Sequence, residues 1–233
     1  MIEIIFFDAG ETILHPHPSF PELFASVSTA HGRRVSPEDV EQVQERLAPH
    51  LVDLAEDSGV ASPSLSAADA RTFWTYLYRR FLEELGIPDE SLAAALFETF
   101  SDASSYMLFD DVMPTLRNLQ HDGYRLGLIS NFEGWLEERL VELEVGHVFD
   151  VLVISGLEGV EKPDPEIYRR ALERAEVAPE AAVHVGDSPT FDVVPAATLG
   201  MHTVLLDRVD RYPQAGGLRI SSLKELPVLV AKL

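Results

Sequence analysis

Acidic, hydroxyl and ammonium side chains follow four apolar runs of the sequence, at or after the point where each run ends. Asp8 and Ser130 each stand at the end of one run. Lys162 follows a third run, and Asp187 and Asp192 follow a fourth. Carboxylates gathered in one place repel each other, and a hard cation with oxygen ligands such as Mg²⁺ removes that repulsion. A hydroxyl and an ammonium suit phosphoryl oxygens. These residue types predict a Mg²⁺-assisted phosphoryl-transfer site.

Each of these residues also has a purely structural interpretation. A carboxylate such as Asp8 can cap a loop at a strand end, and Asp187 and Asp192 can cap the helix that follows them. Ser130 precedes a helical pattern and can be its N-cap, a role that is compatible with anion binding at the same helix end. Lys162 can be a solvated loop lysine.

The apolar runs predict the elements that must position these side chains. Short buried strands are expected over residues 2–7, 125–130, 151–155, 182–186 and 203–206, with a further strand at 218–220. Amphipathic helices are expected between them, over residues 112–121, 135–143, 165–176 and 191–199. This alternation predicts an α/β fold with a doubly wound parallel sheet. Ligands bind beyond the carboxyl ends of such strands, so the candidate residues should converge there.

The stretch after the first strand departs from this alternation. Between His15 and Tyr106 no segment has a convincing strand pattern, and helices are expected over residues 20–31, 37–56, 67–85 and 90–104. We therefore expect an all-α domain over residues 16–106, inserted into a core domain formed by residues 1–15 and 107–233. The connecting segments are expected at residues 16–18 and 109–111.

The composition narrows the possible partners. Among 233 residues, 18 are Lys or Arg and 39 are Asp or Glu, a net charge of −21. Such a surface repels nucleic acid and anionic membranes, so neither is an expected partner. Cysteine is absent, which excludes disulfides and thiolate metal sites. No apolar run reaches the roughly 18 residues of a membrane span, and the N-terminus lacks the basic segment of a secretion signal. The expected location is the cytoplasm.

The motifs resemble those of a known family. Four motifs of the haloacid-dehalogenase-like (HAD) hydrolase superfamily are similar to segments of this chain, namely Asp8 with Thr12, Ser130, Lys162-Pro163, and Gly186-Asp187 followed by Asp192. They occur in the family's order, on the expected elements, and cover nearly the whole chain. The helical insert resembles the cap domain of subfamily I members.

The resemblance implies a role for each matching residue. Asp8 would be the nucleophile that forms an aspartyl-phosphate, and Lys162 would steady both the nucleophile and the phosphoryl charge. Ser130, Asn131 and Lys162 are the expected phosphate contacts. The implied substrate is a small phosphorylated metabolite.

The resemblance also implies Mg²⁺ as cofactor. The expected ligands are Asp8, the backbone carbonyl of Gly10 and Asp187. Asp192 is expected either to bind the metal or to orient a water molecule that binds it.

One position departs from the family's phosphatase pattern. A second Asp usually stands two residues after the nucleophile, where it protonates the leaving oxygen and later activates water; here that residue is Gly10. A positioned acid/base contributes about 10²–10⁴-fold to rate, so turnover is expected to be slow. Glu11 is the nearest carboxylate, and His15 and His17 follow the same loop, but the sequence assigns none of them a role.

Three functions stay open at this point. The first is a Mg²⁺-dependent phosphatase with slow acid/base chemistry. The second is a homologue that binds phosphate or a metabolite without turnover, which the loss of the acid at Gly10 favours. The third is a 2-haloacid dehalogenase, which also lacks that acid but has no use for the carboxylates Asp187 and Asp192.

Overall fold

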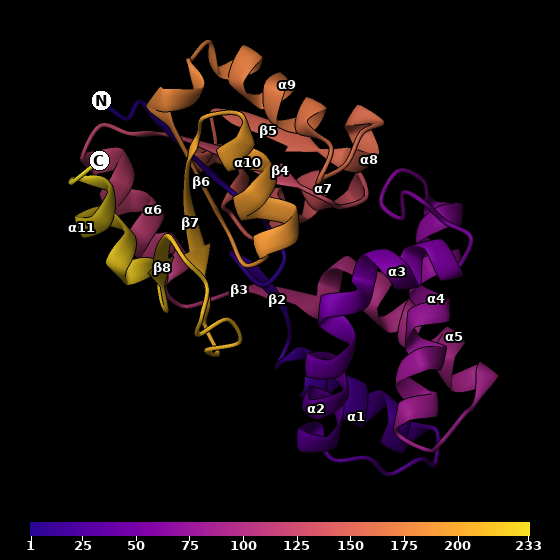
Figure 1. Cartoon of the computed structure of the whole chain (residues 1–233). Helices are drawn as coiled ribbons and strands as arrows, with labels where there is room; N and C mark the ends of the chain where they lie inside the picture. Colours follow the sequence, from indigo (N-terminus) through magenta and orange to yellow (C-terminus); the bar gives the residue numbers. More distant parts are fainter. The chain divides into compact units, whose positions relative to one another are not determined.

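The computed structural model describes residues 1–233, which form two compact units. The core unit comprises Met1–Leu14 and Leu108–Leu233, and the helical unit comprises His15–Met107. The boundaries lie one residue from those expected from the sequence. In Figure 1 the helical unit carries α1 to α5 and the core unit carries the large sheet.

The core unit contains a six-stranded sheet in the order β5-β4-β1-β6-β7-β8, in which all neighbouring strands are parallel. The strands are β1 (Ile4–Phe7), β4 (Arg125–Ser130), β5 (Val151–Ile154), β6 (Ala182–Gly186), β7 (His202–Leu206) and β8 (Leu218–Ile220). The predicted α/β doubly wound fold is confirmed. Strand β1 lies between β4 and β6, with Phe7 in register with Leu128 and Val185.

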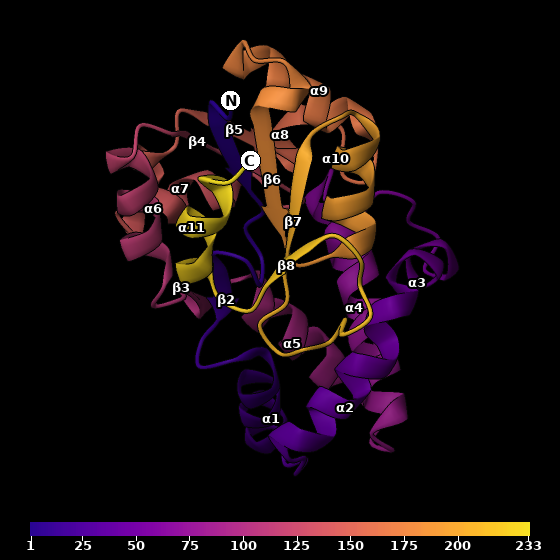
Figure 2. The same ribbon diagram turned by 60° about the vertical axis from the view of Figure 1, so that its left-hand side comes forward.

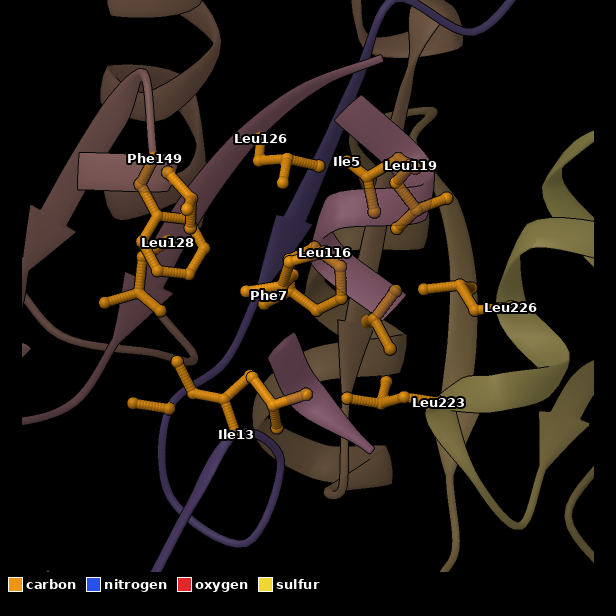
Figure 3. Packing of buried hydrophobic residues seen from close by; sticks show 14 of the residues in the cluster. Ile5, Phe7, Ile13, Leu116, Leu119, Leu126, Leu128, Phe149, Leu223 and Leu226 are labelled. Atoms are coloured by element: carbon orange, nitrogen blue, oxygen red, sulfur yellow. The ribbon is translucent and has the colours of Figure 1, made fainter. Parts of the chain in front are cut away.

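Alternating side chains of β1 pack on opposite faces of the sheet. Ile5 and Phe7 point to the face covered by α6 (Val112–His121) and α11 (Leu226–Val230), and Figure 3 shows them packed with Leu116 and Leu119. Ile4 and Phe6 point to the other face, where α9 (Pro165–Ala175) covers β4 and β5. Figure 2 shows α6 and α11 on one side of the sheet and α9 and α10 on the other. A strand buried on both faces explains the continuous apolar run 4–7.

Short helices complete the core unit: α7 (Trp135–Glu142), η3 (Gly146–Val148), α8 (Ser155–Glu158), η4 (Pro179–Ala181), η5 (Pro189–Val193), α10 (Val194–Thr198) and η6 (Leu223–Glu225). The prediction of one regular helix over 191–199 was wrong, because η5 is a π-helical turn that precedes α10. Pro195 has no N–H to donate to the carbonyl of Phe191, and the Tyr168 hydroxyl donates to that carbonyl instead.

The helical unit consists of α1 (Phe20–Ala30), α2 (Pro37–Leu47), η1 (Ala48–His50), α3 (Leu51–Asp57), α4 (Ala67–Glu84), α5 (Glu90–Ser101) and η2 (Ala103–Ser105). It has its own apolar cluster, in which Phe24, Phe81 and Leu96 are buried. The prediction of one helix over 37–56 was wrong. The chain breaks into α2, η1 and α3 around Pro49, whose ring and missing N–H interrupt a regular helix.

Two short strands were not predicted. Strands β2 (Leu14–Pro16) and β3 (Tyr106–Leu108) pair with each other where the chain passes from one unit to the other. The pairing is continued by a hydrogen bond from the His17 N–H to the Ser105 carbonyl (2.7 Å). Three residues are too few to show the alternation by which a strand is recognised in sequence.

Candidate active site

Three neighbouring strands of the core sheet end at the candidate site. β1 ends immediately before Asp8, β4 ends at Ser130, and β6 ends immediately before Asp187. Because β4, β1 and β6 are adjacent and parallel, their carboxyl ends place these three side chains at one edge of the sheet. This convergence is the one that the doubly wound fold predicts.

Asp8 is the centre of a buried hydrogen-bond network. Its Oδ1 accepts hydrogen bonds from the Ser130 hydroxyl (2.9 Å) and from the Lys162 ammonium (2.5 Å). The N–H of Ala9 donates to the Ser130 hydroxyl oxygen (3.3 Å), which orients that hydroxyl toward Asp8. No hydrogen bond reaches Asp8 Oδ2 within the protein. One oxygen of the carboxylate is thus fixed and the other stays available.

The backbone of Lys162 is held by the side chain of Asn131. The Lys162 N–H donates to Asn131 Oδ1 (2.7 Å), and Asn131 Nδ2 donates to the Lys162 carbonyl (2.8 Å). Asn131 follows the end of β4, so this pair links the lysine loop to the sheet. The sequence did not predict this positioning role, and the contact of Asn131 with phosphate stays a prediction.

Asp192 is fixed by three hydrogen bonds. Its Oδ1 accepts from the Lys162 ammonium (2.6 Å) and contacts His184 Nε2 (3.0 Å), while its Oδ2 accepts from the N–H of Ser188 (3.0 Å). It packs so closely against Gly186 that a Cβ on that glycine would lie 2.2 Å from Asp192 Cγ. Both carboxylate oxygens are therefore engaged within the protein.

Asp187 completes a cluster of carboxylates. Ligand atoms of Asp8, Asp187 and Asp192 all lie within 4.8 Å of one another. The Asp187 carboxylate accepts no hydrogen bond within the protein, and the Lys162 ammonium contacts only the other two carboxylates, Asp8 and Asp192. Three hard oxygen donors at this separation suit a divalent cation, and the donor set fits Mg²⁺.

The electrostatics of the site follow from burial and from these contacts. Burial, together with the Asp192 and Asp8 carboxylates, raises the pKa of Asp187 well above its ordinary value. Burial also raises the pKa of Asp8, against the opposing effect of Lys162. Burial favours a neutral Lys162, but the Asp192 and Asp8 carboxylates outweigh it and raise the pKa of the lysine. Lys162 is the fixed cation of the site.

The loop after Asp8 contains Gly10, at the position where the phosphatase pattern has a second Asp, and Glu11. Gly10 does not have a positive φ, whereas Glu11 does, at 55°. A Cβ at Gly10 would lie 3.3 Å from Cε2 of Phe132. Burial raises the pKa of Glu11, and the neighbouring Arg211 and Arg208 oppose that effect. Metal binding by the Gly10 carbonyl stays a prediction.

Arg208 is a residue that the sequence analysis missed. Its guanidinium donates to the Thr12 carbonyl (2.8 Å) and to both oxygens of Asp111 (2.9 and 3.0 Å), and it lies over the ring of Phe109 (3.9 Å to the centroid). It thereby holds the loop after β1 from a distance of 196 positions in the chain. No local spacing in the sequence reveals such a contact.

Comparison with known proteins identifies the family. The model of the haloacid dehalogenase-like hydrolase family matches residues 2–200. The chain belongs to this family. The HAD membership expected from the four motifs is thereby confirmed. The chain is a hydrolase, as the description of the family states. No helix is long and apolar enough to cross a membrane.

Two curated relatives and one solved structure show how this HAD hydrolase compares with known members. Haloacid dehalogenase-like hydrolase domain-containing protein 3 of Mus musculus is 30% identical over 210 residues, which cover 88% of the chain and 82% of the relative. Phosphoserine phosphatase of Thermus thermophilus is 35% identical over 172 residues, covering 71% and 69%. The structure of 2-haloacid dehalogenase from Pseudomonas syringae matches with a TM-score of 0.62 and 26% identity, covering 100% of this chain and 99% of the other.

Proposed function

We propose that this HAD hydrolase is a Mg²⁺-dependent phosphatase that acts on small phosphorylated metabolites through an aspartyl-phosphate on Asp8. The observation that carries the proposal is the position of the Asp8 carboxylate. Its Oδ1 is held by Ser130 and Lys162, and its Oδ2 is available. Ligand atoms of Asp8, Asp187 and Asp192 lie within 4.8 Å of one another, an arrangement that suits a cation. The phosphatase relative from Thermus thermophilus supports the same reaction class.

The residues of the chain would divide the reaction as follows. The Asp8 carboxylate attacks phosphorus, a bond forms between its oxygen and phosphorus, and the bond to the leaving oxygen breaks with its electron pair. Ser130 and Lys162 donate hydrogen bonds to Asp8 and orient it, and Lys162 stabilises the charge on the phosphoryl oxygens. Attack by water on the acyl phosphate then releases phosphate and regenerates Asp8.

Asp8, Asp187 and the Gly10 carbonyl would hold the Mg²⁺ ion. Bound Mg²⁺ would neutralise the carboxylate cluster and the phosphoryl oxygens. Asp192 has both oxygens engaged by the protein, which favours the second of its two expected roles, orientation of a metal-bound water through the network around Lys162.

The glycine at position 10 affects both steps of the proposed reaction, departure of the leaving group and hydrolysis of the aspartyl-phosphate. With no carboxylic acid at this position, the leaving oxygen departs without a proton from the side chain at residue 10, and no carboxylate there activates water in the second step. Phosphates with good leaving groups, such as aryl and acyl phosphates, should be hydrolysed faster than sugar phosphates. The aspartyl-phosphate should persist longer than in enzymes that have the acid.

Hydrolysis of p-nitrophenyl phosphate by the purified chain tests the proposal. We expect activity with Mg²⁺, none after chelation, and none for Asp8→Asn. Asp122→Asn is the matched control, because Asp122 is exposed and lies just before β4, at the opposite end of the sheet from the site. Activity retained by Asp8→Asn would show that the covalent mechanism is wrong.

A second candidate function is dehalogenation of 2-haloacids. The missing acid at Gly10 and the dehalogenase structure from Pseudomonas syringae favour it. The cluster of Asp187 and Asp192 with Asp8 favours the phosphatase, because attack on a carbon–halogen bond needs no metal ligands. Release of halide from 2-chloropropionate in the presence of a chelator would show that the chain is a dehalogenase. Phosphate binding without turnover would show that it is a binding protein.

A further inference from the structure

His184 is a buried polar residue that the proposed mechanism does not use. It lies in the middle of β6, and its side chain has no exposed surface. Its neighbours Val183 and Val185 point to the opposite face of the sheet, so His184 lies in the layer beneath α9, which is otherwise lined mostly by apolar side chains. The ring of Tyr168 from α9 meets it edge-on, with 5.3 Å between the ring centroids. Placing an imidazole in an apolar layer is costly unless its polar atoms have a partner.

The imidazole has one polar partner, and that partner belongs to the site. His184 Nε2 lies 3.0 Å from Asp192 Oδ1, while His184 Nδ1 is buried without any hydrogen-bond partner. An ionised carboxylate has no hydrogen to donate, so the shared proton belongs to Nε2. His184 is therefore a donor whose single hydrogen bond goes to Asp192.

Asp192 in turn is one of the two carboxylates that hold the Lys162 ammonium. Lys162 Nζ lies 2.6 Å from Asp192 Oδ1 and 2.5 Å from Asp8 Oδ1. His184 and Lys162 thus donate to the same oxygen of Asp192. The network runs without a break from His184 through Asp192 and Lys162 to Asp8.

We propose that His184 is a positioning residue, which fixes the Asp192 carboxylate so that Lys162 stays on the Asp8 carboxylate. A lysine reaches its partner on a flexible four-carbon stem, so the position of its ammonium depends on the groups that hold it. Without the donor at Nε2, Asp192 Oδ1 keeps only Lys162 as partner. The carboxylate, which the N–H of Ser188 still holds at Oδ2, can then tilt at Oδ1, and the ammonium follows Oδ1 away from Asp8.

Kinetics of three variants test this role, which rests on the proposed phosphatase function. In His184→Leu, kcat for p-nitrophenyl phosphate with Mg²⁺ should fall roughly 10–100-fold with little change in KM, as for other residues that orient a functional group. His184→Gln places an amide N–H near the position of Nε2 and should recover most of that loss. If the leucine variant does not fold, His184→Asn replaces it, because its shorter amide does not reach Asp192.

Tyr168→Phe is the matched control. It removes a buried hydrogen bond, from Tyr168 to the Phe191 carbonyl, in the same layer and next to His184, but it removes no hydrogen bond to Asp192 or Lys162. It should lower thermal stability and leave kcat near the wild-type value. An equal fall in kcat for Tyr168→Phe, or a glutamine variant as slow as the leucine variant, would reduce His184 to a packing residue and overturn the proposal.

A crystal structure of His184→Leu separates this proposal from the proposed function. We expect the Lys162 ammonium to lose its hydrogen bond to Asp8 or to Asp192. If both contacts stay at 2.5 and 2.6 Å, the positioning role is wrong whatever the activity. If the wild-type chain hydrolyses no phosphate ester at all, the phosphatase proposal fails and the structure alone decides the role of His184.

Discussion

The side chain of Asn131 and the backbone of Lys162 exchange two hydrogen bonds, of 2.7 and 2.8 Å, in the manner of a strand pair. The exchange ties the loop that carries the lysine to the end of β4. An amide side chain that satisfies both backbone groups of one residue leaves the position of that residue little freedom. The position of the Lys162 backbone thus depends on Asn131, which lies 31 positions earlier in the chain.

Asn131→Ala should therefore slow the enzyme without removing any of the proposed reacting groups. We expect kcat to fall by up to about 10²-fold, because a small displacement of a catalytic group is costly. Two backbone groups also lose their partner, which should cost about 2 kcal/mol of unfolding free energy. Steady-state kinetics and urea unfolding measure the two effects. Asn118→Ala on the exposed side of α6 is the control, and an equally fast Asn131→Ala would contradict the positioning role.

Asp187→Asn should have opposite effects with and without metal. Its carboxylate is repelled by Asp8 and Asp192, so its removal should raise the melting temperature of the metal-free protein. The same change removes a metal ligand, so the stabilisation by Mg²⁺ should disappear. Thermal unfolding across a Mg²⁺ titration measures both effects, with Asp122→Asn as the control. An unchanged Mg²⁺ affinity would remove Asp187 from the proposed ligands.

Gly10→Asp should restore acid catalysis. The backbone of Gly10 is compatible with a side chain, and the new Cβ needs the Phe132 ring to shift by a few tenths of an ångström. We expect turnover of alkyl phosphates to rise by up to ~10²-fold, and turnover of p-nitrophenyl phosphate to rise less. A leaving-group series on the wild type and the variant measures the change. Gly10→Asn is the control, since it adds the same bulk without an acid. A wild type that hydrolyses alkyl and aryl phosphates equally fast would indicate another acid, with Glu11 the first to test.

Asp111 should make the stability of the core unit sensitive to acid. Burial opposes its ionisation, but hydrogen bonds from Arg208 and Ser222 outweigh burial and lower the pKa of Asp111 below its ordinary 3.8. A lowered pKa contributes stability that is present above pH 3.8 and is lost as the pH falls through the lower, folded-state value.

Asp111→Asn should therefore cost about 2–3 kcal/mol at pH 7, because Arg208 loses its paired charge, and clearly less below pH 3. Unfolding by urea at several pH values measures the difference between the variant and the wild type. A difference that is the same at pH 7 and at pH 2.5 would show that the ion pair does not contribute in this way.

The sheet and the convergence of the motif residues were predictable because they depend on local patterns. A strand such as 182–186 is a continuous apolar run, and the residues that follow parallel strands must meet at one edge. The break at Pro49 and the π-helical turn before Pro195 both lie next to prolines that are visible in the sequence. A helical pattern on both sides of a proline does not show whether the helix continues.

The parts of the site that were not predictable depend on pairings across the chain. The sequence did not show that the amide groups of Asn131 bind the backbone of Lys162, and it showed His184 only as one residue of a buried strand. Arg208 reaches the loop after β1 from the last quarter of the sequence. Only the folded arrangement brings such pairs together, since nothing in the local sequence encodes the partner.

The central place of β1 in the sheet has a consequence for the order of events during synthesis on the ribosome. β1 leaves the ribosome before the other strands of the sheet, but its two hydrogen-bonded neighbours, β4 and β6, follow only after the whole helical unit has been made. Until residue 186 emerges, the apolar segment Ile4–Phe7 has an unpaired edge, and such edges favour aggregation. The helical unit is contiguous, so all of its residues emerge before either neighbour of β1 is complete. The nascent chain thus carries an incompletely paired β1 until β6 has been made, and contacts with other chains would form at β1 during this interval.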